Sequence, residues 1–247
     1  MLGVLGGMGP LATVDFLNKL IKETGNVTDQ RHIPTITWSV PQIPDRSNHI
    51  VNGAENPFPA LRRGALQLQT LGASVIAIPC NTAHFWYEEL INNTDVTILH
   101  IVDAVIEQLQ HLNSGSTLAP DTAKRTIGLL GTTGTIKANV YQHKLTAANW
   151  HVITPCASNQ HKLMKGIALA KHGDIHAARM IFLSQVEKLK QQGAQAIILG
   201  CTEIPAVLEH TDELIDSNQA LARRCVQWFD ATYNGIQRDA NIHTPKQ

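Results

Sequence analysis

Two cysteines carry the strongest chemical signal in this sequence. Cys80 follows the apolar run 73–78, Cys201 follows the apolar run 194–199, and small polar residues come after each. A parallel strand that ends at a cysteine presents the sulfur at the carboxyl edge of the sheet, where open α/β sheets bind their ligands. We expect a helix to begin after each cysteine, and its amino-terminal dipole to favour the thiolate.

The surrounding pattern repeats together with the cysteine, after about 120 residues, which is far too long a period for a solenoid. Alternating apolar strands and amphipathic helices predict an α/β protein with two pseudo-symmetric lobes, each a parallel sheet flanked by helices, with the active site in the cleft between them. We assign residues 1–102 and 210–247 to the first lobe and 103–209 to the second. A linker-like stretch lies at 113–121.

Hydrophobic periodicity places the individual elements. The expected strands are 2–5, 33–40, 73–78 and 96–101 in the first half, and 126–130, 151–154, 194–199 and 213–216 in the second. The main expected helices are 11–24, 57–71, 102–112, 159–170, 175–192 and 217–228, with one more from the turn at 131–135 to about 147. The glycine turn at 6–10 lacks the Gly-x-Gly-x-x-Gly pattern, so we expect its N–H groups to face a small anion and not a dinucleotide.

Composition excludes several classes of function. The chain has 247 residues, of which 43% are hydrophobic and 16% charged, as in an ordinary soluble globular protein. Twenty acidic residues balance twenty basic ones, which disfavours binding to nucleic acid or to a membrane surface. No apolar run approaches the roughly 18 residues that span a bilayer, and no basic leader precedes the first strand. We therefore expect a cytoplasmic protein.

The remaining cysteine and histidine signals are weaker. Four cysteines without a Cys-x-x-Cys pair do not indicate a disulfide framework or a zinc ribbon. Cys225 lies on a helical pattern and is expected in the core, whereas Cys156 could reach a cleft. A disulfide between Cys80 and Cys201 needs Cα atoms within about 7 Å and leaves little room for a cleft. His84 is about one helical turn beyond Cys80 and is expected to point away, which disfavours a thiol hydrolase.

Two thiols that face each other across a planar carbon suit racemisation or epimerisation. One cysteine removes a proton as thiolate, and the other returns a proton to the opposite face as thiol. The free thiol pKa of about 8.5 is close enough to neutrality for acid–base catalysis. The carbanion-like transition state then needs N–H groups and hydroxyls aimed at its carboxylate.

Five motifs resemble, in the same order, those of the cofactor-independent aspartate/glutamate racemase family. They are Gly-Gly-Met-Gly-Pro (6–10), Ile-Pro-Asp-Arg (43–46), Pro-Cys-Asn-Thr-Ala-His (79–84), Leu-Gly-Thr (130–132) and Gly-Cys-Thr-Glu (200–203). The glutamate racemase of cell-wall synthesis has His where this chain has Glu203, and its glycine turn contains Asp-Ser-Gly. The sequence is therefore more similar to the aspartate racemase branch.

The resemblance implies a function for each matching residue. Cys80 and Cys201 would be the acid/base pair, without pyridoxal phosphate or a metal, in a protein that is a homodimer by the family's habit. The substrate's α-carboxylate and amino group would be bound by Asn81, Thr82, Thr132, Thr133 and Thr202. Arg46 and Lys165 would recognise the side-chain carboxylate, and Met8, Ser47, Thr135 and Glu203 complete the expected substrate-binding set.

The sequence leaves several alternatives open. Arg46 alone would pair with Asp45 at the surface, and a lysine on a helix such as Lys165 is usually solvated. An arginine at the site favours a substrate with a second carboxylate, most directly aspartate, with glutamate or both amino acids as the alternative. A maleate isomerase or hydantoin racemase type of activity, and an amino-acid-binding regulatory protein without turnover, are further possibilities.

Overall fold

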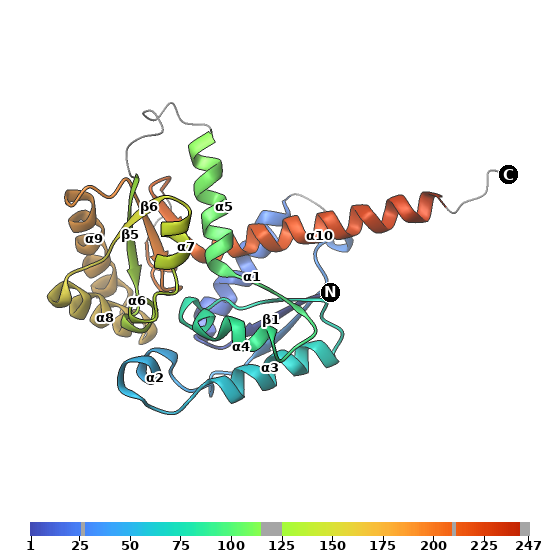
Figure 1. The fold of residues 1–247 in the computed structure, drawn as a ribbon, viewed down its shortest axis with the longest axis horizontal. Coiled ribbons are helices and arrows are strands. Elements are labelled where there is room, and N and C mark those ends of the chain that lie inside the picture. The colour runs from blue at the N-terminus through green and yellow to red at the C-terminus, as the bar shows by residue number, and fades with distance from the viewer. Residues whose placement is uncertain (26–27, 115–124, 209–210, 243–247) are drawn as a thin grey trace.

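Figure 1 shows the computed structural model, which describes residues 1–25, 28–114, 125–208 and 211–242. It contains two four-stranded sheets, ordered β2-β1-β3-β4 and β6-β5-β7-β8, and every pair of neighbouring strands is parallel. The first sheet consists of β1 (Leu2–Gly6), β2 (Thr35–Ser39), β3 (Val75–Ala77) and β4 (Thr97–Leu99). The second consists of β5 (Arg125–Gly131), β6 (Trp150–Ile153), β7 (Ala196–Gly200) and β8 (Leu214–Asp216). The identical strand order confirms the predicted two-lobed α/β repeat; most of the linker-like stretch, from residue 115, lies outside the described residues.

The helices of the first half follow the predicted pattern, with one addition. They are α1 (Pro10–Thr24), α2 (Arg46–Asn52), α3 (Phe58–Thr70), α4 (Tyr87–Ile91) and α5 (Ile101–Ser114), with 3₁₀ helices η1 (Asp29–Arg31) and η2 (Asn81–Trp86). Pro10 occupies the first turn of α1, where its missing N–H costs nothing. The short helix α2 replaces part of an expected loop, because the Asp45 carboxylate caps it by accepting a hydrogen bond from the Asn48 N–H at 2.6 Å.

The helices of the second half are α6 (Thr133–Lys137), α7 (Gln142–Ala147), α8 (Ala157–Lys171), α9 (Ile175–Gln191) and α10 (Ser217–Ile242). The single helix expected up to residue 147 is two short helices, because Asn139, with a φ of 52°, interrupts it. The Thr132 hydroxyl caps α6 by accepting a hydrogen bond from the Thr135 N–H at 3.1 Å. The last helix extends well beyond the expected end at residue 228.

Helix α5, which follows β4, and helix α10, which follows β8, pack across the boundary between the two sheets. Helix α10 packs against α1 of the first half, and α5 packs against α10 and α7 (Figure 1). Strand β8, however, pairs with β7 in the second sheet, although the sequence-based division placed residues 210–247 in the first lobe. The other lobe boundaries remain a prediction.

A continuous hydrophobic core holds the lobes together. One cluster of buried side chains combines Leu2 and Phe16 of the first half with Ile127, Tyr141 and Ile198 of the second. Two further clusters fill the remaining face of each sheet. All five residues of β1 are buried, as expected for a parallel strand covered on both faces. Within the described residues, no helix is long and apolar enough to cross a membrane.

Candidate active site

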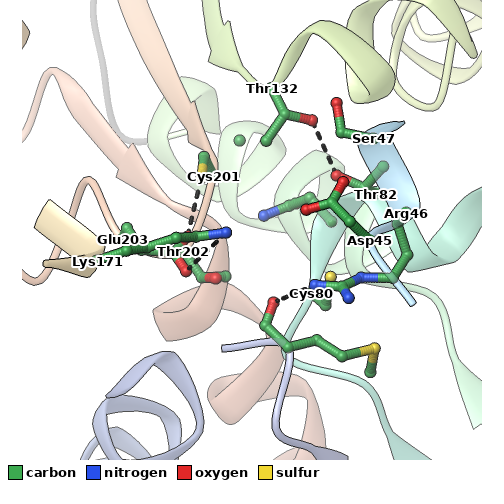
Figure 2. Close-up of a pocket in the computed structure, with 13 residues that line it drawn as sticks. Asp45, Arg46, Ser47, Cys80, Thr82, Thr132, Lys171, Cys201, Thr202 and Glu203 are labelled. Atoms are coloured by element: carbon green, nitrogen blue, oxygen red, sulfur yellow. Dashed lines mark hydrogen bonds and ion pairs between the residues drawn. The ribbon is translucent and has the colours of Figure 1, made fainter. Parts of the chain in front are cut away.

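Both cysteines line one cleft between the lobes (Figure 2). Cys80 follows β3 and Cys201 follows β7, which are the equivalent strands of the two sheets. Their side chains are buried free thiols, 5% and 4% exposed. The other residues that line the cleft are Met8, Asp45, Arg46, Ser47, Asn81, Thr82, Thr132, Lys171, Gly200, Thr202 and Glu203.

Three predicted site residues do not line this cleft. Thr135 is fully buried behind it, and the Thr133 hydroxyl accepts a hydrogen bond from the Gln160 amide at 3.3 Å. Lys165 is exposed on α8. The lysine that reaches the cleft is Lys171, the last residue of the same helix. No sequence motif marks Lys171, because the packing of the end of α8 against the other lobe is not visible in the sequence.

Arg46 is held by the backbone of the loop that precedes it. Its guanidinium donates hydrogen bonds to the carbonyl oxygens of Ile43 at 3.0 Å, Pro44 at 2.9 Å and Met8 at 3.2 Å. The side chain is 9% exposed. Arg46 is therefore fixed at the cleft wall, and the alternative of a surface ion pair with Asp45 is wrong.

Hydroxyl groups connect the two lobes beside the cysteines. The Thr82 hydroxyl lies 3.0 Å from that of Thr132 and 2.8 Å from that of Thr135, and the latter two are 3.0 Å apart. The Gly134 N–H donates a hydrogen bond to the Ser47 hydroxyl at 2.9 Å. A Cβ on Gly134 would lie only 2.6 Å from the Ser47 Cα, so the close approach of α2 and α6 requires glycine here.

Cys201 and Glu203 form a direct polar pair. The Cys201 thiol donates a hydrogen bond to Glu203 Oε2 at 3.0 Å, and Lys171 Nζ lies 3.9 Å from Glu203 Oε1. Burial, followed by the charge of Glu203 and its hydrogen bond, raises the pKa of the Cys201 thiol well above its ordinary value. Burial lowers the pKa of Lys171, but Glu203, Cys201 and Cys80 outweigh burial, so this pKa is raised and the ammonium is retained.

These observations correct the predicted source of thiol activation. Residues 201–208 form turns and bends, so no helix begins after Cys201. Pro205 accounts for this, since the residue before a proline disfavours helical backbone. Cys80 is followed by the 3₁₀ helix η2. The expectation that a helix dipole favours the thiolate is therefore wrong for Cys201.

The glycine turn after β1 also differs from its predicted function. The Gly7 N–H donates a hydrogen bond to the Thr13 hydroxyl at 2.9 Å, so this amide does not face an anion. Gly7 has a φ of 93°, and a Cβ there would lie 2.4 Å from the backbone of Val40. The turn instead brings Met8 into the cleft wall.

His84 is not placed to activate Cys80. It is buried, its Nε2 lies 3.1 Å from the Ile78 carbonyl oxygen, and its ring centroid is 4.9 Å from that of His100. Burial, and then the neighbouring His100, lower the pKa of His84 well below its ordinary value. His84 is absent from the cleft lining, which disfavours a Cys–His hydrolase.

The other two cysteines lie away from the cleft. Cys156 is exposed before α8, and Cys225 is buried in the shared core, where burial raises its pKa to about 12. The prediction of a core position for Cys225 is therefore confirmed, and Cys156 does not reach the site. In the part of the chain that the structure describes, no group of three or more His, Cys, Asp or Glu side chains is arranged to bind a metal ion.

Comparisons with known proteins agree with this geometry. A family model described as Asp/Glu/Hydantoin racemase matches residues 5–225. The "Broad specificity amino-acid racemase RacX" of Bacillus subtilis is 30% identical over 239 residues, covering 93% of this chain and 98% of that protein.

Solved structures show the same fold. The aspartate racemase of Picrophilus torridus superposes with a TM-score of 0.80 at 30% identity, covering 92% of this chain and 93% of that one. The glutamate racemase of Francisella tularensis has a TM-score of 0.64 at 17% identity, covers 94% and 81% of the two chains, and shares the fold. This chain therefore belongs to the Asp/Glu/hydantoin racemase family and is an amino-acid racemase.

Proposed function

We propose that the protein interconverts L- and D-aspartate by proton transfer between two thiols, without pyridoxal phosphate or a metal. The observation that carries the proposal is the presence of Cys80 and Cys201, from equivalent strands of opposite lobes, in the wall of one cleft. A planar carbanion between them would be reached from one face by each sulfur. One thiol alone would suffice for a nucleophilic mechanism.

The reaction requires a base, an acid and a sink for negative charge. One cysteine, as thiolate, takes the α-proton, and the other, as thiol, protonates the opposite face. Charge moves onto the α-carboxylate in the transition state, so fixed donors at that carboxylate lower the barrier. Thr82, Thr132 and Thr202 line the cleft together with the two cysteines, and their hydroxyls are uncharged donors for this carboxylate.

Arg46 and Lys171 support an acidic side chain in the substrate. Among the described contacts of Arg46, three of the five guanidinium N–H groups bond to backbone carbonyls. The remaining N–H groups can bind a carboxylate from a position that the loop has already fixed. Lys171 replaces Lys165 in our assignment of the second cation, because it lines the cleft.

A broader substrate range is the second candidate. The two cations of the cleft, Arg46 and Lys171, are balanced by two carboxylates, Asp45 and Glu203. Such a site carries no large excess of positive charge and therefore also suits neutral side chains. The name of the Bacillus subtilis relative, a broad specificity racemase, is consistent with this alternative. Glutamate belongs in the same comparison, since it differs from aspartate by one methylene.

The first experiment is incubation with L-aspartate in deuterated water, without added cofactor and with a metal chelator. We expect loss of the α-proton signal together with appearance of D-aspartate. An α-proton that persists in aspartate, glutamate and a panel of neutral amino acids would contradict a racemase of these substrates. Binding without exchange would indicate a regulatory protein, and exchange in a hydantoin or isomerisation of maleate would indicate the corresponding relative.

A cytoplasmic homodimer remains our prediction for the assembly and its location. Size-exclusion chromatography with light scattering measures the mass in solution directly. A mass near twice the chain's 27.0 kDa is the expected result.

A further inference from the structure

We infer that Glu203 is a positioning residue that keeps the proton on Cys201, so that the resting enzyme holds Cys201 as the acid and Cys80 as the base. The inference rests on the proposed two-thiol function and adds that the two cysteines are not equivalent in the resting enzyme. The two sequence motifs look equivalent, but only Cys201 has a carboxylate acceptor two residues away. The site is thereby predisposed toward one enantiomer.

The geometry around Cys201 carries the argument. Its thiol donates to Glu203 Oε2 at 3.0 Å, and both side chains are almost fully buried, 4% and 5% exposed. An ionised carboxylate accepts hydrogen bonds and does not donate them, so this contact favours the protonated form of the Cys201 sulfur. A thiolate at the same position would face the Glu203 charge in a poorly solvated environment, which is unfavourable. Figure 2 shows the thiol directed toward the carboxylate.

The equivalent position beside Cys80 has no such partner. The second residue after Cys80 is Thr82, whose hydroxyl is engaged with Thr132 and Thr135. The charged or titratable groups that share the cleft with Cys201 are Glu203 and Lys171 from its own lobe and Cys80, Arg46 and Asp45 from the other. Of these side chains, all within the described residues, only Glu203 forms a hydrogen bond with Cys201, and its carboxylate accepts that bond from the thiol.

Lys171 has the opposite effect within the same group. Its ammonium lies 3.9 Å from Glu203 Oε1 and lowers the cost of a negative charge on Cys201. Glu203 therefore favours the thiol of Cys201, and Lys171 limits this preference so that the thiolate can still form during turnover. Glu203 and Lys171 together set the relative populations of two forms of the enzyme: Cys201 thiol with Cys80 thiolate, and Cys201 thiolate with Cys80 thiol.

The proton balance follows directly. In the favoured form, the Cys80 thiolate accepts the α-proton, and the electrons of the C–H bond pass to the carbanion. The S–H bond of Cys201 then breaks, its proton adds to the other face, and its sulfur keeps the electron pair. The enzyme now holds a Cys80 thiol and a Cys201 thiolate, and proton exchange with water restores the first form.

Alkylation with iodoacetamide tests the inference without turnover. The rate at Cys201, followed by peptide mass spectrometry as a function of pH, reports formation of its thiolate. In Glu203→Gln, we expect the profile of Cys201 to move to lower pH by about one unit or more, because a neighbouring negative charge has been removed. Glu203→Asp restores the carboxylate and should move the profile back, whereas Glu187→Gln, at an exposed position on α9, should leave it unchanged.

A second variant keeps the test decisive if Glu203→Gln folds poorly. Lys171→Met removes the opposing charge, so the Cys201 profile should move to higher pH. A Cys201 profile that is the same in the parent, Glu203→Gln and Lys171→Met would overturn the inference. This outcome is independent of the proposed function, which fails only if no substrate undergoes α-proton exchange.

Kinetics supply the link to racemisation. The two enantiomers have equal free energies in solution, so kcat/KM must be the same in both directions for every variant. The inference predicts unequal KM values for L- and D-aspartate in the parent, and a ratio of KM values closer to one in Glu203→Gln. A purely structural function of Glu203 would lower kcat/KM without changing that ratio.

Discussion

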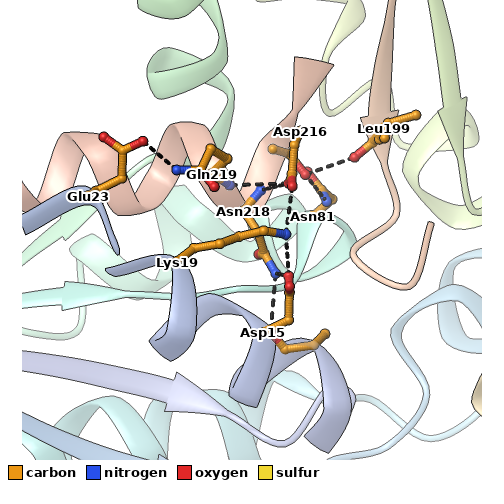
Figure 3. A network of polar contacts seen from close by, with 10 residues as sticks. Asp15, Lys19, Glu23, Asn81, Leu199, Asp216, Asn218 and Gln219 are labelled. Atoms are coloured by element: carbon orange, nitrogen blue, oxygen red, sulfur yellow. Dashed lines mark hydrogen bonds and ion pairs between the residues drawn. The ribbon is translucent and has the colours of Figure 1, made fainter. Parts of the chain in front are cut away.

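The Asn81 amide donates a hydrogen bond to the Ser217 hydroxyl at 2.9 Å, within a polar network that also includes the Leu199 carbonyl (Figure 3). Ser217 in turn donates to the carbonyl oxygen of Leu199, near the end of β7, at 2.9 Å. The Tyr141 hydroxyl donates a hydrogen bond to the side-chain oxygen Oδ1 of Asn81 at 2.6 Å. The residue after Cys80 is therefore tied to the strand that leads to Cys201.

Replacing Ser217 by alanine should disturb both folding and turnover. Ser217 is fully buried, and its loss leaves the Asn81 N–H and the Leu199 carbonyl without this partner, at a cost of about 1–3 kcal/mol in unfolding free energy. We also expect kcat/KM to fall by roughly 10- to 100-fold, because the relative position of the two thiols is loosened. Urea unfolding and steady-state kinetics measure both effects.

The exposed Ser158→Ala on α8 is the matched control and should change neither quantity. Unchanged kcat/KM in Ser217→Ala, with lower stability alone, would mean that this bond holds the fold without positioning the cysteines.

Lys171 and Lys165 offer a direct test of substrate recognition on one helix. In Lys171→Met, we expect kcat/KM for aspartate to fall by roughly 10- to 100-fold, as for loss of one charge-assisted hydrogen bond worth about 1.5–3 kcal/mol. Lys165→Met should retain parental kinetics, because Lys165 is exposed and absent from the cleft lining. The reverse result would restore the assignment made from the sequence.

A buried histidine pair makes stability depend on pH. Burial lowers the pKa of His100 to about 3 and that of His84 well below its ordinary value. The unfolded chain, with histidine pKa values of about 6.5, therefore binds protons first as the pH falls. Stability from His100 is present above about pH 6.5 and is lost progressively toward pH 3.

The effect can be measured by urea unfolding at two pH values. Between about pH 7.5 and 5, His100 alone should cost about 2 kcal/mol of unfolding free energy, and His100→Asn should remove that part of the pH dependence. The exposed His161→Asn serves as the control. An equally steep pH dependence in His100→Asn would contradict this assignment.

The fold was predictable because its signals are local and repeated. Each buried parallel strand is a short apolar run, and the two cysteines stand at the ends of equivalent strands, so their meeting in one cleft follows from pseudo-symmetry. The place of β8 in the second sheet was not predictable, because nothing in the run Leu214–Asp216 states which edge it joins.

The site was predictable only where residues adjoin a motif. The end of α8 was predicted to within one residue, but its sequence does not show which of its lysines faces the cleft, so Lys171 was missed. The influence of Glu203 on Cys201 depends on the burial of both side chains and on their orientation, and neither can be read from the sequence Cys-Thr-Glu. Thr135 was expected in the substrate-binding set, but it is fully buried outside the cleft lining, where its hydroxyl contacts those of Thr82 and Thr132.

Deuterium exchange in single-thiol variants tests the central claim most directly. Cys80→Ala and Cys201→Ala each leave one sulfur, which can remove a proton from one face and return deuterium to the same face without racemisation. We predict that each variant exchanges the α-proton of only one aspartate enantiomer, that the two variants select opposite enantiomers, and that Cys156→Ala racemises like the parent. Racemisation that survives in either variant, or exchange of the same enantiomer by both, would contradict the two-thiol account.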